Sequence, residues 1–284
     1  MSAVTVHSRQ AKSILSKASG FIDTFDFTLN PYAGCAFGCT YCYAAFFAPT
    51  QEQQEQWGQW VDVKENALDL LRKKRKRPLI EQSIYMSSVT DPYQPVERKL
   101  ELTRSILEEM LRYHRIRLVI QTRSPLVTRD LDLLRQFEHV RVNMTITTDD
   151  ETVRRAFEPL CASNPQRMEA VSELSDAGIN TCVALTPLLP VHDPVSFAHA
   201  LRETGARRFV IQHFHATKSR FVAGTGEQAR RLLLERGWTE AHYEEVKRVM
   251  GGILPNLYEG KPGFKPDWDA PEWKWLERDE AQDG

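Results

Sequence analysis

The chain carries, directly after a predicted strand, the stretch Asn30-Pro31-Tyr32-Ala33-Gly34-Cys35-Ala36-Phe37-Gly38-Cys39-Thr40-Tyr41-Cys42-Tyr43. Its three cysteines are spaced C-x3-C-x2-C, and thiolates this close together can hold three corners of one [4Fe–4S] cube. Glycines beside them let the backbone fold tightly around such a group. The fourth iron then has no protein ligand from this loop, so it can chelate a small molecule, as the amino and carboxylate groups of a methionine would.

The competing interpretation of this loop is a zinc knuckle or a set of buried free cysteines. Structural zinc sites usually use four ligands, often in paired C-x2-C units, and neither Cys161 nor Cys182 lies in such a unit. The spacing therefore favours an iron–sulfur cluster with Cys35, Cys39 and Cys42 as its metal ligands. Because the two remaining cysteines are isolated from each other, we expect no second cluster.

Length, composition and charge are those of an ordinary globular protein. The 284 residues include 37 Lys and Arg against 38 Asp and Glu, which gives a formal net charge of −1. No apolar run approaches the ~18 residues of a membrane span, so no membrane partner is expected. The first residues lack the pattern of a signal peptide, and five cysteines is an odd number for a disulfide framework. Together these features predict a cytoplasmic location.

Short apolar or β-branched runs alternate with longer helical patterns. The predicted strands are Phe25 to Leu29, Ser83 to Ser87, Arg117 to Thr122, Val140 to Thr147, Asn180 to Leu185 and Arg208 to His213. The predicted helices are Val61 to Lys76, Glu97 to Tyr113, Leu126 to Phe137, Pro165 to Ala177 and Pro194 to Glu203. This alternation predicts parallel strands joined by helical crossovers, and six such strands suit a partial TIM-type (β/α)6 barrel of the α/β class.

Several predicted strands end in polar residues, and the carboxyl ends of barrel strands carry active sites. We expect residues 1–20 to form an N-terminal extension and residues 21–215 to form the core barrel. Residues 216–284 are expected to form a C-terminal helical flank with a polar tail, because the pattern changes there to two further helices, Gly224 to Arg236 and Thr239 to Met250.

The cysteine loop, with Tyr41 just before the third cysteine, resembles the signature of radical S-adenosylmethionine (SAM) enzymes. Together with residues 88–95, Ser-Val-Thr-Asp-Pro-Tyr-Gln-Pro, and with Glu158-Pro159, it is similar to the spore photoproduct lyase-like (DNA repair photolyase-like) branch. The resemblance covers roughly residues 21–215. It implies a lyase-like enzyme in which a reduced [4Fe–4S] cluster cleaves SAM to methionine and a 5′-deoxyadenosyl radical, which removes hydrogen from a substrate. It also implies an electron donor such as flavodoxin or ferredoxin.

The resemblance further implies the residues that act in the site. Tyr41 joins the three cysteines as a catalytic residue and lies beside the adenine. Carried over position by position, the SAM contacts are Tyr41, Ser88, Thr90, Asp91, Arg123 and Thr145. Arg123 suits the methionine carboxylate because a guanidinium donates two parallel hydrogen bonds. The ordinary alternatives are that Arg123 caps a loop and that Thr145 is a strand residue without a ligand.

The substrate is not identified by the sequence. Spore photoproduct lyases use a cysteine hydrogen-atom donor at the end of the second strand, where this chain has Ser88, and a serine O–H bond is too strong for that role. Repair of a thymine lesion in DNA, as in spore photoproduct lyases, is one alternative function, although Ser88 argues against the usual route. A non-catalytic metal-binding or nucleic-acid-binding protein is another, because residues 72–77 read Arg-Lys-Lys-Arg-Lys-Arg. That run suits phosphate contacts, but the net charge of −1 favours the simpler interpretation of a solvated helix end.

Overall fold

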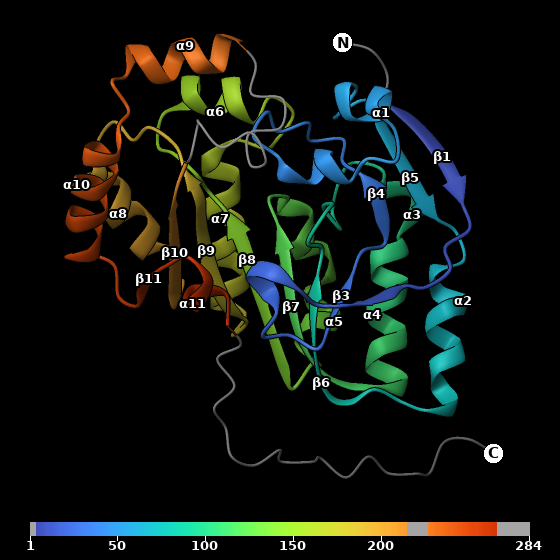
Figure 1. Cartoon of the computed structure of the whole chain (residues 1–284). Helices are drawn as coiled ribbons and strands as arrows, with labels where there is room; N and C mark the ends of the chain where they lie inside the picture. Colours follow the sequence, from blue (N-terminus) through green and yellow to red (C-terminus); the bar gives the residue numbers. More distant parts are fainter. Residues whose placement is uncertain (1–3, 215–226, 266–284) are drawn as a thin grey trace.

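The computed structural model describes residues 4–214 and 227–265, and most of its strands form one eight-stranded sheet (Figure 1). In order across the sheet the strands are β11 (Leu257–Glu259), β10 (Arg208–His213), β9 (Asn180–Leu188), β8 (His139–Thr145), β7 (Arg115–Thr122), β6 (Ile80–Met86), β3 (Phe27–Leu29) and β2 (Leu15–Lys17). Strands β3 and β6 to β10 are parallel and correspond to the six predicted strands. The sheet is curved but not closed, so the predicted partial TIM-type barrel is confirmed.

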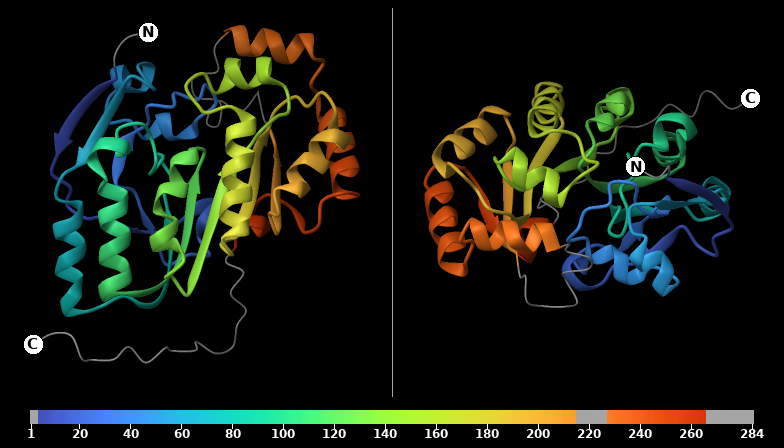
Figure 2. Two further views of the ribbon diagram at one scale, coloured as in Figure 1. Left: turned by 180° about the vertical axis from the view of Figure 1, so that it is seen from behind. Right: turned by 90° about the horizontal axis from the view of Figure 1, so that it is seen from above.

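The crossover helices lie on the outer side of the curved sheet, where they form an arc in the view from above (Figure 2). They are α2 (Ala67–Arg72), α3 (Glu97–Leu100), α4 (Leu102–Tyr113), α5 (Leu131–Leu134), α7 (Asn164–Asp176) and α8 (Pro194–Glu203), joined by α10 (Glu240–Gly251). Three further helices, α1 (Gln51–Glu55), α6 (Glu151–Phe157) and α9 (Glu227–Glu235), lie at the upper end of the sheet in Figure 1. No helix among the described residues is long and apolar enough to cross a membrane.

A second, three-stranded sheet corrects one prediction. It contains β1 (Thr5–Arg9), β5 (Trp60–Lys64) and β4 (Tyr32–Gly34), with β5 in the middle. The helix predicted from Val61 is wrong for its first residues, because β-branched valines alternate there and pair on both sides with other strands. The helix begins only at Ala67, and the basic run continues it as a 3-10 turn, Lys73–Lys76. Residues before 21 thus supply strands to both sheets.

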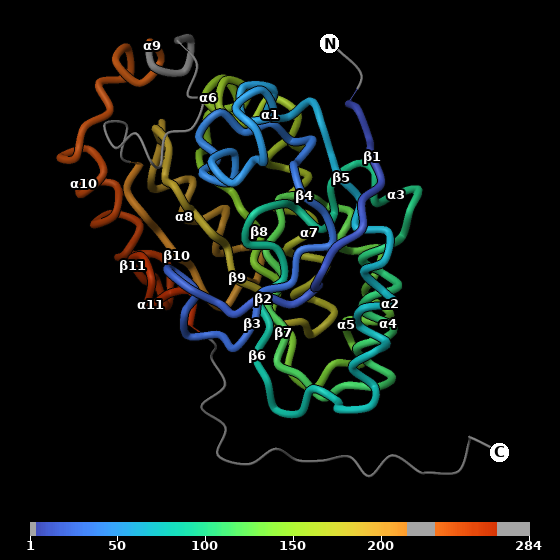
Figure 3. The backbone as a smooth tube through the Cα atoms, turned by 45° about the vertical axis from the view of Figure 1, so that its right-hand side comes forward, coloured from blue at the N-terminus to red at the C-terminus, as the bar shows by residue number. Residues whose placement is uncertain are grey.

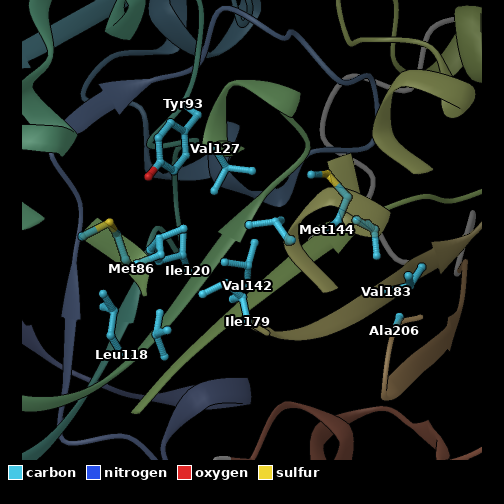
Figure 4. Packing of buried hydrophobic residues seen from close by; sticks show 14 of the residues in the cluster. Met86, Tyr93, Leu118, Ile120, Val127, Val142, Met144, Ile179, Val183 and Ala206 are labelled. Carbon is cyan, nitrogen blue, oxygen red and sulfur yellow. The ribbon is translucent and has the colours of Figure 1, made fainter. Parts of the chain in front are cut away.

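The main core lies between the sheet and its outer helices. Side chains at even positions of the central strands, such as Leu118, Ile120, Val142 and Met144, point to this layer (Figure 4). All four are fully buried, and they pack against residues of the helices and loops such as Ile179. A parallel sheet needs cover on both faces, and this layer supplies it on the outside.

The inner face of the sheet is partly polar. Tyr85 Oη and Asn143 Nδ2 both donate to Gln121 Oε1, at 2.8 and 3.1 Å, and Gln121 Nε2 donates to Thr145 Oγ1 at 2.7 Å. These side chains stand at odd positions of β6, β7 and β8, so one hydrogen-bonded row crosses three strands inside the barrel. The row satisfies polar groups that would otherwise be costly to bury.

The C-terminal segment closes the amino-terminal end of the barrel. The short helix α11 (Lys261–Phe264) packs there, and the buried Arg141 of β8 donates to the carbonyl oxygens of Phe264 and Lys265 at 3.1 and 3.0 Å. Phe264 belongs to an inner cluster with Phe25 and Tyr85. The barrel interior is consequently filled at this end, which leaves the carboxyl ends of the strands as the place for a site.

Gly34, at the end of β4, tests how tightly the cysteine loop packs on β5. Its φ of +72° lies in the left-handed region, and a Cβ there would stand 2.6 Å from the Trp60 carbonyl oxygen. We expect Gly34→Ala to lower the free energy of unfolding by about 3 kcal/mol or more, since backbone strain and overpacking add. Gly20 also has a positive φ but open space around it, so Gly20→Ala should cost only about 1 kcal/mol. Equal losses in chemical denaturation would show that the close packing is not what matters.

Candidate functional site

The cysteine loop lies at the carboxyl-terminal edge of the main sheet, at the same end of the molecule as α1 and α6 (Figure 3). Cys35 and Cys39 are buried and Cys42 is half-buried. Two tight turns shape the loop, in which the amides of Gly38 and Cys42 donate to the carbonyls of Cys35 and Cys39. Gly38, with φ +57°, lets the first turn pass within close contact of Gly58. The predicted ligands therefore share one compact loop at the expected end of the barrel.

Residues after β6 hold this loop in place. Thr90 Oγ1 donates to the Gly34 carbonyl at 2.6 Å, and Gln94 Oε1 accepts from the Ala36 amide at 2.9 Å. The Gln94 amide in turn donates to Thr90 Oγ1 at 3.3 Å. The resemblance predicts that Thr90 contacts SAM. The structure shows that Thr90 supports the cysteine loop, and its contact with SAM stays a prediction.

A fully buried carboxylate, Glu158, joins the loop to the barrel. Its Oε1 accepts from the Tyr41 hydroxyl, from Thr147 Oγ1 at 3.1 Å and from Arg123 Nη1 at 3.3 Å. Its Oε2 lies 2.6 Å from Arg167 Nη2, and both of these side chains are completely buried. Burial would raise the pKa of Glu158, but the Arg167 and Arg123 guanidiniums outweigh it and lower this pKa. The carboxylate is therefore ionised and paired with two cations.

Arg123, predicted for SAM, lies between this carboxylate and the cysteine loop. Its Nη1 is 2.8 Å from Cys39 Sγ and 2.9 Å from the Tyr41 hydroxyl. A hydrogen bond from Cys161 and the charge of Arg123 lower the pKa of the Cys39 thiol. The structure thus brings together Cys39, Tyr41 and Arg123, which the sequence analysis assigned separately.

The donor set fits an iron–sulfur cluster. Burial raises the pKa of Cys35 well above its usual value and that of Cys42 to about 11, and the neighbouring Cys39 thiolate adds repulsion to both. Three thiolates this close are unfavourable by themselves, and a cationic cluster that binds them as ligands removes that penalty. No three His, Cys, Asp or Glu side chains among the described residues are grouped to share a single metal ion. The fit therefore depends on thiol chemistry, loop shape and the neighbouring guanidinium.

The remaining predicted contacts lie at strand ends on the same edge. Asp91 accepts from the amides of Tyr93 and Arg123 and from Thr122 Oγ1, so its carboxylate ties the end of β6 to the end of β7. The Ser88 amide donates to Asn30 Oδ1 at 3.0 Å, and its carbonyl accepts from the Tyr43 hydroxyl. No recorded contact tests whether Ser88, Asp91 or Thr145 binds SAM, so these assignments stay predictions.

Sequence reasoning gave no role to several residues that complete the site. Arg167 and Thr147 lie near Glu158 in the sequence but far from the cysteine loop, and nothing in the cysteine motif points to them. Ser87 is a further case: its φ is +74° and its buried hydroxyl has no hydrogen-bond partner among the described residues. Strained backbone often occurs at functional sites. The only sequence signals were the Glu158-Pro159 pair and the polar ends of the strands.

Comparisons with known proteins agree with this geometry. A family model described as the radical SAM superfamily matches residues 29–203. An uncharacterized protein of Methanocaldococcus jannaschii is 37% identical over 178 residues, which cover 63% of this chain and 65% of that protein. A protein of Pseudomonas phage M6 named radical SAM Nalpha-GlyT isomerase is 22% identical over 280 residues, or 88% of this chain and 57% of that one. The chain thus matches 57 to 65% of the length of these relatives.

Solved structures show the same fold. A spore photoproduct lyase mutant with bound AdoMet and dinucleoside spore photoproduct superposes with a TM-score of 0.59 at 16% identity, over 90% of this chain and 81% of that one. Streptococcus suis SuiB bound to SAM superposes with a TM-score of 0.51 at 12% identity, over 82% of this chain and 49% of that one. At these identities the likeness concerns the fold.

The Glu158 network generates a test of stability. We expect Glu158→Gln to lower the free energy of unfolding by about 3–5 kcal/mol, because it leaves the buried Arg167 guanidinium and the partly buried Arg123 guanidinium without their counter-ion. Chemical denaturation of the folded chain measures this loss. Glu245→Gln is the matched control, since Glu245 pairs with Arg248 on a solvent-exposed helix face and its loss should leave the midpoint unchanged. Similar midpoints for the two variants would contradict the assigned role of Glu158.

Proposed function

The chain belongs to the radical SAM superfamily, and from this premise we propose that it is an enzyme whose Cys35, Cys39 and Cys42 bind a [4Fe–4S] cluster. When bound and reduced, the cluster supplies the electron that cleaves SAM to methionine and a 5′-deoxyadenosyl radical, which abstracts hydrogen from a substrate. The observation that carries the proposal is that one compact loop at the carboxyl edge of the parallel sheet carries three free cysteines, Cys35, Cys39 and Cys42. An electron donor such as flavodoxin or ferredoxin belongs to the same proposal.

The chain's own residues supply binding and orientation. The side-chain contacts recorded for Arg123 use Nη1, whereas a guanidinium carries further donors on Nε and Nη2. We assign those donors to the carboxylate of SAM. Glu158 fixes the Arg123 side chain and the Tyr41 ring from behind, so that both keep one orientation beside the cysteine loop.

The barrel interior is the proposed place for the substrate. The row of hydrogen bonds through Gln121 reaches Thr145 at the carboxyl end of β8, and its polar groups suit a substrate with donors and acceptors. Ser88 stands where the lyase-like branch has its cysteine hydrogen donor, and a hydroxyl does not donate a hydrogen atom. We therefore propose that the substrate is not the thymine lesion of spore DNA.

Iron binding and SAM cleavage test the proposal directly. Anaerobic reconstitution should give one four-iron cluster per wild-type chain, and dithionite with SAM should then release 5′-deoxyadenosine. Replacing Cys35, Cys39 or Cys42 by Ala should abolish both, since a cluster edge without its thiolate is open to solvent. The matched control is the Cys161→Ala and Cys182→Ala double variant, which should keep its iron. Loss of iron in that control, or cleavage without the three cysteines, would refute the ligand assignment.

The same reconstituted protein addresses the substrate. With UV-damaged DNA that carries the thymine lesion, 5′-deoxyadenosine should form without loss of the lesion. Multiple-turnover repair to intact thymines would instead establish the lyase activity and refute the argument from Ser88.

Arg123 gives a separate prediction for SAM binding. Loss of a hydrogen bond to a charged group costs about 1.5–3 kcal/mol, so Arg123→Ala should weaken SAM binding roughly tenfold or more. Calorimetry on the cluster-loaded chain measures this, with iron content confirming that the site is intact. Arg155→Ala, on the exposed face of α6, should bind SAM like the wild type. Unchanged SAM affinity in the Arg123→Ala variant would show that another residue binds the SAM carboxylate.

A further inference from the structure

A fourth cysteine, Cys161, reaches the cysteine loop. Its Sγ lies 3.7 Å from Cys39 Sγ, although the two residues are 122 positions apart in the chain. Cys161 follows α6, and its side chain is buried in one cluster with Cys39, Tyr41 and Phe157. Nothing in the local sequence of Cys161 suggests a partner, so this contact was not expected from the sequence.

Hydrogen bonds to the backbone near Cys39 and near Cys161 hold the two sulfurs in place. The Thr40 amide donates to the Phe157 carbonyl at 2.9 Å, which joins the cysteine loop to the end of α6. Arg154, buried in α6, donates to the carbonyl oxygens of Glu158 and Cys161 at 3.0 and 2.9 Å. These hydrogen bonds to main-chain carbonyls therefore fix the two segments that carry Cys39 and Cys161.

A small oxidant has a route to one of the two thiols. Cys39, with Gly38 and Thr40, lines a hollow of about 570 Å³ whose other wall is α1 and Trp57. Cys161 does not line this hollow. Both residues are buried, at 4% and 8% exposure, so we assign the hollow beside Cys39 as the entry for the oxidant; the Cys161 sulfur already touches the thiol of that residue.

We propose that Cys39 and Cys161 form a disulfide when the chain lacks its cluster and meets a peroxide. Cys39 first takes an oxygen atom from hydrogen peroxide, which breaks the O–O bond and releases one water; the Cys161 thiol then displaces a second water and forms the S–S bond. In sum, two thiols and one peroxide give one disulfide and two waters. The bond keeps Cys39 from irreversible over-oxidation, and a thiol reductant restores both residues. The disulfide itself does not depend on the proposed function; only its role in protecting Cys39 as a cluster ligand rests on that function.

Sequence spacing alone points to another pair. Cys39 and Cys42 form a C-x2-C unit and are the nearest cysteines along the chain, so in an unfolded chain loop closure favours that pair. The folded structure instead records the sulfur contact of Cys39 with Cys161. A Cys39–Cys161 disulfide would show that the fold determines the pairing, whereas a Cys39–Cys42 disulfide would show that sequence spacing determines it.

Peptide mapping of the full chain tests the proposal. Cluster-free protein, shown to be folded by circular dichroism, is treated anaerobically with one equivalent of hydrogen peroxide. It should lose two of its five thiols and yield a non-reduced peptide that links Cys39 to Cys161. Cys182→Ala, a buried cysteine in β9, should form the same link, whereas Cys161→Ala should not. The oxidised wild type should take up cluster iron only after reduction of the disulfide.

Two results would overturn the proposal. One is a Cys39 to Cys42 link as the main product in the folded wild type; the other is sulfinic acid on Cys39 without any link. The same treatment in guanidinium serves as the reference, because there the Cys39 to Cys42 pair should dominate. Failure of iron to bind the reduced protein would count against the proposed cluster but leave the disulfide result intact.

Discussion

Much of this architecture follows from the requirement that a parallel sheet be covered on both faces. On the outer face helices and mainly aliphatic side chains meet this requirement. On the inner face, polar side chains in the middle and aromatic side chains at one end contact one another. Aromatic residues fill the amino-terminal end, and Gln121 satisfies Tyr85, Asn143 and Thr145 in the middle. Only the carboxyl end is left for chemistry.

At the carboxyl end of the barrel, the charge of the buried Glu158 side chain is balanced by charges of opposite sign. Glu158 is buried with two guanidiniums, and each of the three groups would be costly to bury alone. Because Arg123 directly follows β7, Arg167 lies in α7 and Glu158 follows α6, their ion pairs join three parts of the chain. The network fixes Tyr41 and Arg123 against the cysteine loop before any ligand is present, which lowers the cost of ordering the site.

Much of the fold could be predicted because buried parallel strands are recognised from apolar runs, and α8 spans Pro194–Glu203 as predicted, with the Asp193 side chain as its N-cap. The short strands β1, β2, β4 and β11 were missed, since pairing with distant partners, not local pattern, makes them strands. The helix predicted from Glu97 is interrupted at Glu101, because the Glu97 carboxylate accepts the Thr103 amide and starts α4 anew. In the site, spacing revealed three cysteines on one loop. Contacts across more than a hundred positions, such as that of Tyr41 with Glu158, leave no local signal.

The floor of the barrel has a consequence for how the protein is made. Arg141 on β8 finds its partners in Phe264 and Lys265, which are synthesised more than a hundred residues later. Until that segment has been translated, two carbonyl acceptors of the Arg141 guanidinium are missing from the barrel interior, although Arg141 Nε still donates to Asn143 Oδ1. The amino-terminal end of the barrel therefore gains its last hydrogen bonds only after residue 265 has left the ribosome. Closing of this end is thereby coupled to the translation of α11.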